Sequence, residues 1–133
     1  MSTRQVKIFI AFLLLLFSQS GCKQATEPKA SDIYVNFEIE IDFHNDSVKV
    51  ALDDKILLES RVTTDYTISL AWSSEFQRLS RAAHNLFFTV VEYDVQSHYL
   101  IDTTNDTSTV LLRFDKSTKK ISIHQIKGVV LRD

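Results

Sequence analysis

The sequence predicts an all-β fold, a single antiparallel β-sandwich of the Ig-like or jelly-roll-like kind with about eight strands. Apolar and polar residues alternate along residues 33–43, and short apolar segments then recur roughly every ten residues. The turns between them are rich in Asn, Asp and Ser. A sandwich is favoured over a closed barrel because the inward positions are bulky and the chain has only 2 glycines for barrel corners.

The first expected strand, residues 33–43, has the clearest pattern. Apolar residues occupy its odd-numbered positions, and the polar residues between them are Asn36, Glu38, Glu40 and Asp42. Because successive side chains of a strand point to opposite faces, one face is expected on the core and the other in water. The acidic row is interpreted as a soluble outer face that resists edge pairing, rather than as the carboxylate pair of a glycoside hydrolase.

The later strands are expected from the same alternation. Residues 53–55 form the turn of a hairpin. Leu86, Phe87 and Phe88 follow one another, so residues 85–95 are expected to form a central strand with both faces covered. The other expected segments are 48–52, 56–63, 66–72, 98–102, 109–115 and 121–123, with 129–131 as an edge strand or a packed segment.

Residues 73–84 allow two interpretations. Ser74 as a cap, with Phe76, Leu79 and Ala83 at helical spacing, indicates one short helix. The alternative, which we favour, extends the preceding strand through Phe76 and makes residues 79–85 a connection. Residues 79–86 (LSRAAHNL) resemble the L-S-x-G-x-H-x-L approach to a strand in bacterial β-sandwich modules, including carbohydrate-binding ones, with Ala82 at the glycine position.

The N-terminal residues indicate an export signal. Arg4 and Lys7 precede the apolar run 8–17, and polar or small residues follow at 18–21. A helix that crosses a bilayer needs about 20 apolar residues, so this shorter run is typical of a signal peptide.

The signal ends at Ser20-Gly21-Cys22, which resembles the lipobox of bacterial lipoproteins, although Gln19 stands where that family usually has leucine. The resemblance implies that Cys22 is acylated and becomes the first mature residue. Lys23, rather than aspartate, follows the cysteine and favours the outer membrane over the inner one. The alternatives are an ordinary secretory signal with a nearby thiol and a short membrane anchor that is never cut.

This organisation divides the chain into a signal peptide (1–21), a lipidated cysteine with a flexible tether (22–32) and a β-sandwich domain (33–133). The tether would extend over roughly 30 Å at most. Without the signal the chain keeps 13 Lys and Arg against 17 Asp and Glu, and this balance gives no basic stripe for nucleic acid. Cys22 is the only cysteine, so no disulfide within the chain is expected.

Few residues point to chemistry. His44, His84, His98 and His124 lack metal-ligand spacing, and residues 102–107 lack the glycine and glutamate of an EF-hand loop. No G-x-S-x-G or S-x-x-K motif is present, so we expect no enzyme, no cofactor and no metal. Tyr34 and Tyr99 are the candidate ligand-binding residues, because two tyrosines on one exposed face could form a platform for a sugar.

The leading functional hypothesis is therefore a membrane-anchored lipoprotein of the bacterial cell envelope. Its sandwich would bind or position an envelope protein or a glycan without catalysis. A carbohydrate-binding module is one alternative. A small hydrolase is a weaker one, because it needs carboxylates or histidines that the spacing does not bring together.

Overall fold

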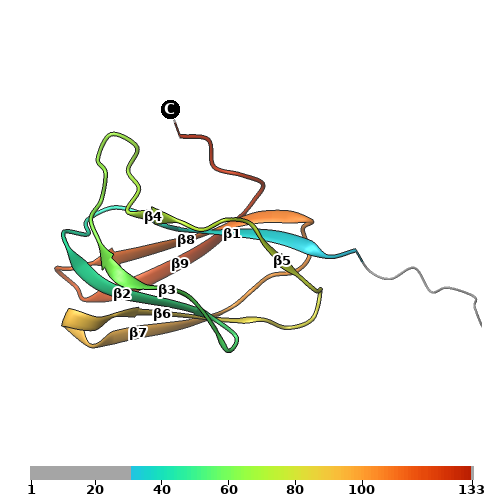
Figure 1. Cartoon of the computed structure of the whole chain (residues 1–133), viewed down its shortest axis with the longest axis horizontal. Coiled ribbons are helices and arrows are strands. Elements are labelled where there is room, and N and C mark those ends of the chain that lie inside the picture. The colour runs from blue at the N-terminus through green and yellow to red at the C-terminus, as the bar shows by residue number, and fades with distance from the viewer. Residues whose placement is uncertain (1–30, 133) are drawn as a thin grey trace, which may run out of the picture.

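The computed structural model describes residues 31–132, and two sheets pack face to face in it as a single β-sandwich (Figure 1). The predicted fold class is confirmed. The described residues form nine strands and one short 3-10 helix. These are β1 (Ile33–Ile39), β2 (Asp46–Leu52), β3 (Lys55–Val62), β4 (Trp72–Ser73), β5 (Gln77–Leu79), β6 (Asn85–Val90), η1 (Val91–Tyr93), β7 (Val95–Leu100), β8 (Thr107–Asp115) and β9 (Lys120–Lys127).

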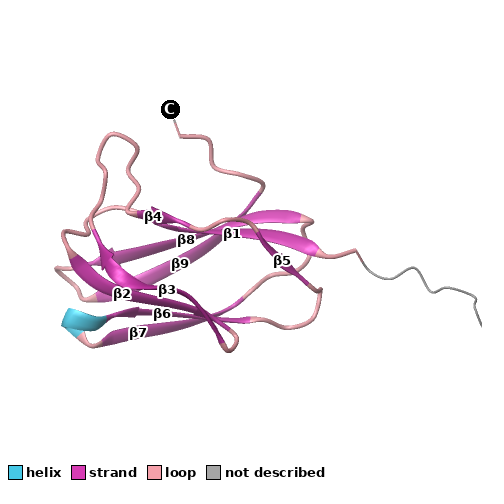
Figure 2. Ribbon diagram, viewed as in Figure 1, coloured by secondary structure: helices cyan, strands magenta, loops and turns pink. Residues whose placement is uncertain are grey.

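The β1 sheet has the order β4-β1-β8-β9, with β5 also paired to β1, and the β2 sheet has the order β3-β2-β6-β7 (Figure 2). Among the described strands, β1 and β8 form the single parallel pair, with Tyr34 opposite Thr107 and Ile39 opposite Leu112. All other pairs are antiparallel. The β1 sheet is therefore held together by pairing between strands that are far apart in the sequence.

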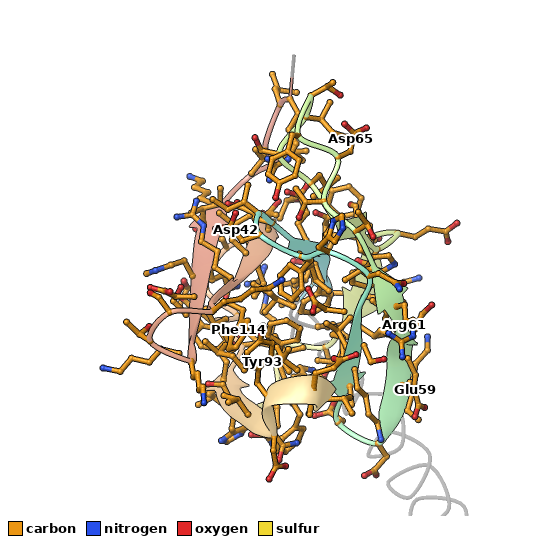
Figure 3. The ribbon with its side chains drawn as sticks, turned by 90° about the vertical axis from the view of Figure 1, so that its left-hand side faces the viewer. Asp42, Glu59, Arg61, Asp65, Tyr93 and Phe114 are labelled. Carbon is orange, nitrogen blue, oxygen red and sulfur yellow. The ribbon has the colours of Figure 1, made fainter. Side chains whose placement is uncertain are left out.

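The core lies between the two sheets and follows the predicted alternation. Ile33, Val35, Phe37 and Ile39 of β1 are fully buried, as are Val50 and Phe88 of the facing sheet. The rings of Phe43 and Phe88 meet edge to face at 6.3 Å. At the end of the sandwich that carries η1, the ring centroids of Tyr93 and Phe114 lie 5.0 Å apart between the sheets (Figure 3).

The turns rest on residues other than glycine, as the composition predicts. Positive φ angles occur at Asp42, Asn45, Asp53, Ser69 and Asp94, and also at Lys119. Short polar side chains tolerate this conformation better than most residues because they bond to nearby backbone. Gly128, with φ of +83°, adopts the left-handed conformation at the end of β9.

The first strand is shorter than predicted. It ends at Ile39, and the backbone of Asp42 takes φ of 72°, which no strand accommodates. Ile41 is consequently 38 % exposed instead of buried, while Phe43 returns to the core. The periodicity continues past the strand because Phe43 is fixed by a hydrogen bond from its amide to Thr64 Oγ1 at 3.0 Å.

The prediction of a strand at 66–72 is wrong for most of its length. A bridge between Asp65 and Leu70 closes a turn, which projects from the sandwich between β3 and β4 (Figure 1). Asp65 Oδ1 accepts hydrogen bonds from the Thr67 amide at 2.9 Å and hydroxyl at 2.6 Å. These local bonds compete with a ladder and favour the turn.

Residues 73–84 contain no helix, but the favoured interpretation is wrong in detail: no strand runs through Phe76, because β4 ends at Ser73, and Leu79 belongs to β5 rather than to the connection. The short strands β4 and β5 both lie beside β1, and the chain then crosses to β6. The expected strand 85–95 is central in the β2 sheet but stops at Val90, where η1 and Asp94 turn the chain into β7. Its burial alternates, so Phe87 is only half-buried and lies on an outer face, in contrast to the prediction of a strand covered on both faces.

Candidate functional site

The outer face of the β2 sheet carries an apolar row across all four of its strands. The register places Ile56, Ala51, Phe87 and His98 side by side on β3, β2, β6 and β7. The rings of Phe87 and His98 are stacked, with centroids 4.9 Å apart and planes inclined by 19°. Ala51 is the small member of the row and leaves room on the other side of Phe87.

A polar row runs parallel to the apolar one. It consists of Glu59, Lys49, Thr89 and Gln96, again one residue from each strand. Figure 3 shows Glu59 on the outer side of β3. Two residues along a strand span about 6.6 Å, so this is the separation of the rows. Within residues 31–132, the side chains of Lys49, Thr89 and Gln96 form no hydrogen bond with one another or with other residues.

A shallow groove of about 430 Å³ lies where the two rows meet. Its lining residues are Lys49, Ala51, Phe87, Thr89, Asp94, Val95 and Gln96. This volume lies in the range of small-molecule sites. We call this surface, made of the groove residues and His98, the Phe87 face.

His98 is held in place by a second contact. Its Nε2 donates to Asn85 Oδ1 at 2.7 Å, because the amide oxygen can only accept. This bond fixes the orientation of the imidazole, and the imidazole in turn supports one side of the Phe87 ring. The Phe87–His98 stack is therefore held in place by contacts within the β2 sheet.

Tyr34 and Tyr99, the predicted ligand-binding pair, are not brought together. Tyr34 is 44 % exposed on β1, whereas Tyr99 lies on β7 in the other sheet and packs against the core. Burial raises the pKa of the Tyr99 hydroxyl, with the Asp102 charge adding to the effect. The two side chains occupy different surfaces, so they cannot form a shared platform.

Ser80, His84 and Asp53 form a hydrogen-bonded chain that sequence spacing did not reveal. His84 Nδ1 lies 2.7 Å from Asp53 Oδ2, and its Nε2 lies 3.2 Å from Ser80 Oγ. The same Nε2 lies 3.0 Å from the carbonyl oxygen of Ser80, which can only accept. Ser80 therefore presents both its hydroxyl and its carbonyl oxygen to the same imidazole nitrogen, which is not directed at the hydroxyl alone.

The hydrogen bonds of Ser80, His84 and Asp53 have a structural role. Asp53 Oδ1 also accepts from the Asn85 amide at 2.8 Å, and the Asp53 amide donates to the Asn85 carbonyl at 2.7 Å. The hydrogen bond from His84, followed by that from Asn85, lowers the pKa of Asp53. These contacts tie the β2–β3 turn to the start of β6.

Two residues of the predicted acidic row, Glu38 and Glu40, are buried, which corrects the interpretation of a soluble outer face; the third, Asp42, is exposed. Glu38 and Glu40 are each 6 % exposed. Arg132 Nη2 lies 2.6 Å from Glu38 Oε2 and 3.2 Å from Glu40 Oε1, and Arg113 lies 2.7 Å from Glu40 Oε2. β1 is an inner strand of its sheet, so these carboxylates have no role in protecting an edge.

The charges of this cluster compensate one another. Burial by itself lowers the pKa of Arg132, but the hydrogen bonds and charges of Glu38 and Glu40 outweigh it and raise that pKa. Arg132 also donates to the carbonyls of Ile68 and Ser69 at 3.1 and 3.3 Å. The cluster therefore attaches the 129–132 segment to β1 and to the projecting turn; no strand forms at 129–131.

The described residues show no group of three or more His, Cys, Asp or Glu placed to hold a metal ion. In the oxygen-rich loop 102–107, Asp102 Oδ1 accepts from the Thr104 amide at 2.9 Å, and Asp106 pairs with Arg81. These side chains form hydrogen bonds and ion pairs with nearby residues, as is typical of a polar turn.

Cys22, the predicted lipidation residue, and the predicted signal peptide lie outside the described residues. Between residues 31 and 132, no helix combines the length and the apolar character needed to span a bilayer. No protein-family model matches the chain, and no curated protein sequence matches it either.

The Phe87 face was missed by sequence reasoning. Its signal was present in the apolar run 86–88, which was interpreted as burial on both faces. Exposure of Phe87 depends on the β2 sheet having nothing packed on its outer side. That arrangement follows from the pairing of distant strands, so no local sequence pattern indicates it.

Proposed function

We propose that this chain is a lipid-anchored module of the bacterial cell envelope that binds another envelope component through its Phe87 face, without catalysis. The observation that carries the proposal is the contrast on that face. The apolar row, with its Phe87–His98 stack, lies beside Lys49, Thr89 and Gln96, whose side chains are not engaged by other described residues. Aromatic surface flanked by unengaged polar groups is the usual make-up of a small-ligand site.

The ionisable clusters elsewhere support a binding role over a catalytic one. The hydrogen bonds of Ser80, His84 and Asp53 hold two turns together. Glu38 and Glu40 are neutralised by Arg132 and Arg113. Glu38 and Glu40 are thus not a free pair of carboxylates for glycoside hydrolysis, and the Ser80 hydroxyl shares His84 Nε2 with the Ser80 carbonyl.

The anchor is proposed from the sequence. Arg4 and Lys7, the apolar run 8–17 and Ser20-Gly21-Cys22 favour export followed by acylation of the cysteine. Lys23 favours the outer membrane. A tether spanning roughly 30 Å at most would join the start of β1, and the end of the sandwich carrying η1 lies opposite that point (Figure 1). The Phe87 groove reaches this distal end through Asp94 and Val95.

Metabolic labelling with an alkynyl fatty acid tests the anchor. We expect the chain to be labelled in bacterial membranes and the Cys22→Ser variant to be unlabelled. The matched control is Cys22→Ser combined with Ser31→Cys, which restores a thiol near the end of the tether and should stay unlabelled. Labelling of Cys22→Ser, or none of the wild type, would overturn the proposal.

A further inference from the structure

We infer that the ligand of the Phe87 face is a neutral pyranose chain, an inference that rests on the proposed binding function and names its ligand class. The apolar row is one side chain wide, with the polar row on one side of it and Asn85 and Leu100 on the other. A pyranose ring has the same division, because C–H groups cover its faces and hydroxyl groups surround its rim. Aromatic rings stack on the C–H face of such rings, as apolar surfaces with a defined geometry.

The dimensions of the face fit one or two sugar units. Ala51 leaves one side of Phe87 open above the groove, while His98 supports the other side at 4.9 Å. The polar row lies about 6.6 Å from the apolar row, within reach of the hydroxyl rim of a sugar stacked on Phe87. Lys49 Nζ, Thr89 Oγ1 and the Gln96 amide supply donors and acceptors for those hydroxyls.

The charges of the face favour a neutral sugar. Lys49 is directly opposite Glu59 in the register, and Asp94 lines the same groove. One cationic and two anionic side chains leave no excess of positive charge for an acidic sugar or a phosphate. The apolar row is also too narrow for the fully desolvated aromatic cluster on which a protein partner would depend.

The test is a titration of the ¹⁵N-labelled full chain, purified in a zwitterionic detergent because glycoside detergents would compete for the site. The probes are cellohexaose, xylohexaose, mannohexaose and chitohexaose, added to about 10 mM so that a Kd of about 1 mM is saturated. We expect at least one probe to shift amide resonances saturably, with the largest shifts in β2, β6 and β7 around Lys49, Phe87 and Gln96.

Three variants separate stacking from a general loss of structure. Phe87→Ala should weaken binding at least tenfold, and Gln96→Ala, at an exposed position, should weaken it without loss of fold. Phe76→Ala is the matched control, because Phe76 is 45 % exposed and belongs to the connection between β4 and β5. Binding by this control should equal that of the wild type.

Absence of shifts on the Phe87 face with all four probes would overturn the inference. Unchanged binding in both Phe87→Ala and Gln96→Ala, or shifts centred on the β1 sheet, would do the same. Fatty-acid labelling of Cys22 is independent of these results. A chain that is labelled but binds none of the sugars would support the lipid anchor and overturn the pyranose ligand. A chain that binds a sugar but is not labelled would do the reverse.

Discussion

Arg132 donates from Nη2 to Oε2 of Glu38 at 2.6 Å, across a separation of 94 positions in the chain. The side chains of the pair are 17 % and 7 % exposed. Removal of one partner of a buried ion pair leaves the other charged and desolvated, which costs far more than the pair contributes. We therefore expect substitution of either partner of this ion pair to destabilise the fold strongly.

Arg132→Ala should reduce the free energy of unfolding by about 3 kcal/mol, because Glu38 then has no cationic partner among the described residues. Urea denaturation followed by the fluorescence of Trp72, the only tryptophan, measures the change. The double variant Glu38→Gln with Arg132→Met should be closer to the wild type than Arg132→Ala is. A neutral Arg132→Ala would show that the carboxylate is solvated.

Phe37→Ala should cost about 3 to 5 kcal/mol, the range for removal of a buried aromatic side chain. Phe37 is fully buried in β1, and its loss opens a cavity between the sheets. Phe76→Ala removes the same atoms from an exposed position and should change stability by less than about 0.5 kcal/mol. Equal effects of the two variants would mean that β1 presents its other face to the core.

Stability should decrease in acid because hydrogen bonds to the charged carboxylate lower the pKa of Asp53 below its ordinary value of 3.8. A carboxylate whose pKa is lower in the folded state stabilises the fold above the unfolded pKa. That contribution is lost as the pH falls through the folded pKa. Asp53→Asn should therefore be less stable than the wild type at neutral pH, and the difference should disappear in acid.

Asp54→Asn is the matched control for this pH dependence. It removes the same charge from the same turn, but the Asp54 side chain forms no hydrogen bond with other described residues. Denaturation midpoints of the three proteins across the acid range decide the question. A wild-type minus Asp53→Asn difference that stays constant with pH would contradict the role of the Asp53 carboxylate.

Ser80 should not react with a fluorophosphonate probe, because its carbonyl oxygen lies 3.0 Å from His84 Nε2 and competes with its hydroxyl for that nitrogen. Intact-mass spectrometry after incubation with the probe measures this. Labelling that disappears in Ser80→Ala would establish an activated serine and revive the hydrolase alternative. His84→Ala should instead lower stability by about 1 to 2 kcal/mol through loss of its hydrogen bonds.

The sequence was sufficient for the features that depend on local pattern. Alternation placed Ile33, Val35, Phe37 and Ile39 on the core, and the scarcity of glycine placed the turns on Asp, Asn and Ser. Both follow from the geometry of one strand or one turn. The β2–β3 hairpin was found for the same reason, since its two strands are joined by a single short turn.

The features that depend on distant partners could not be found in this way. Glu38 and Glu40 have the pattern of a solvent-facing row, and only contact with Arg113 and Arg132 makes their burial tolerable. Phe87 has the pattern of a buried residue, and only the open outer side of the β2 sheet leaves it partly exposed. In both cases the pairing of remote segments overrides the preference that the local sequence indicates.

The most direct test of a lipid-anchored module is the intact mass of the chain isolated from bacterial membranes. We predict a mass equal to residues 22–133 plus a diacylglyceryl group and an amide-linked fatty acid on Cys22. A chain with an unmodified thiol at Cys22, or one that retains residues 1–21, would contradict it.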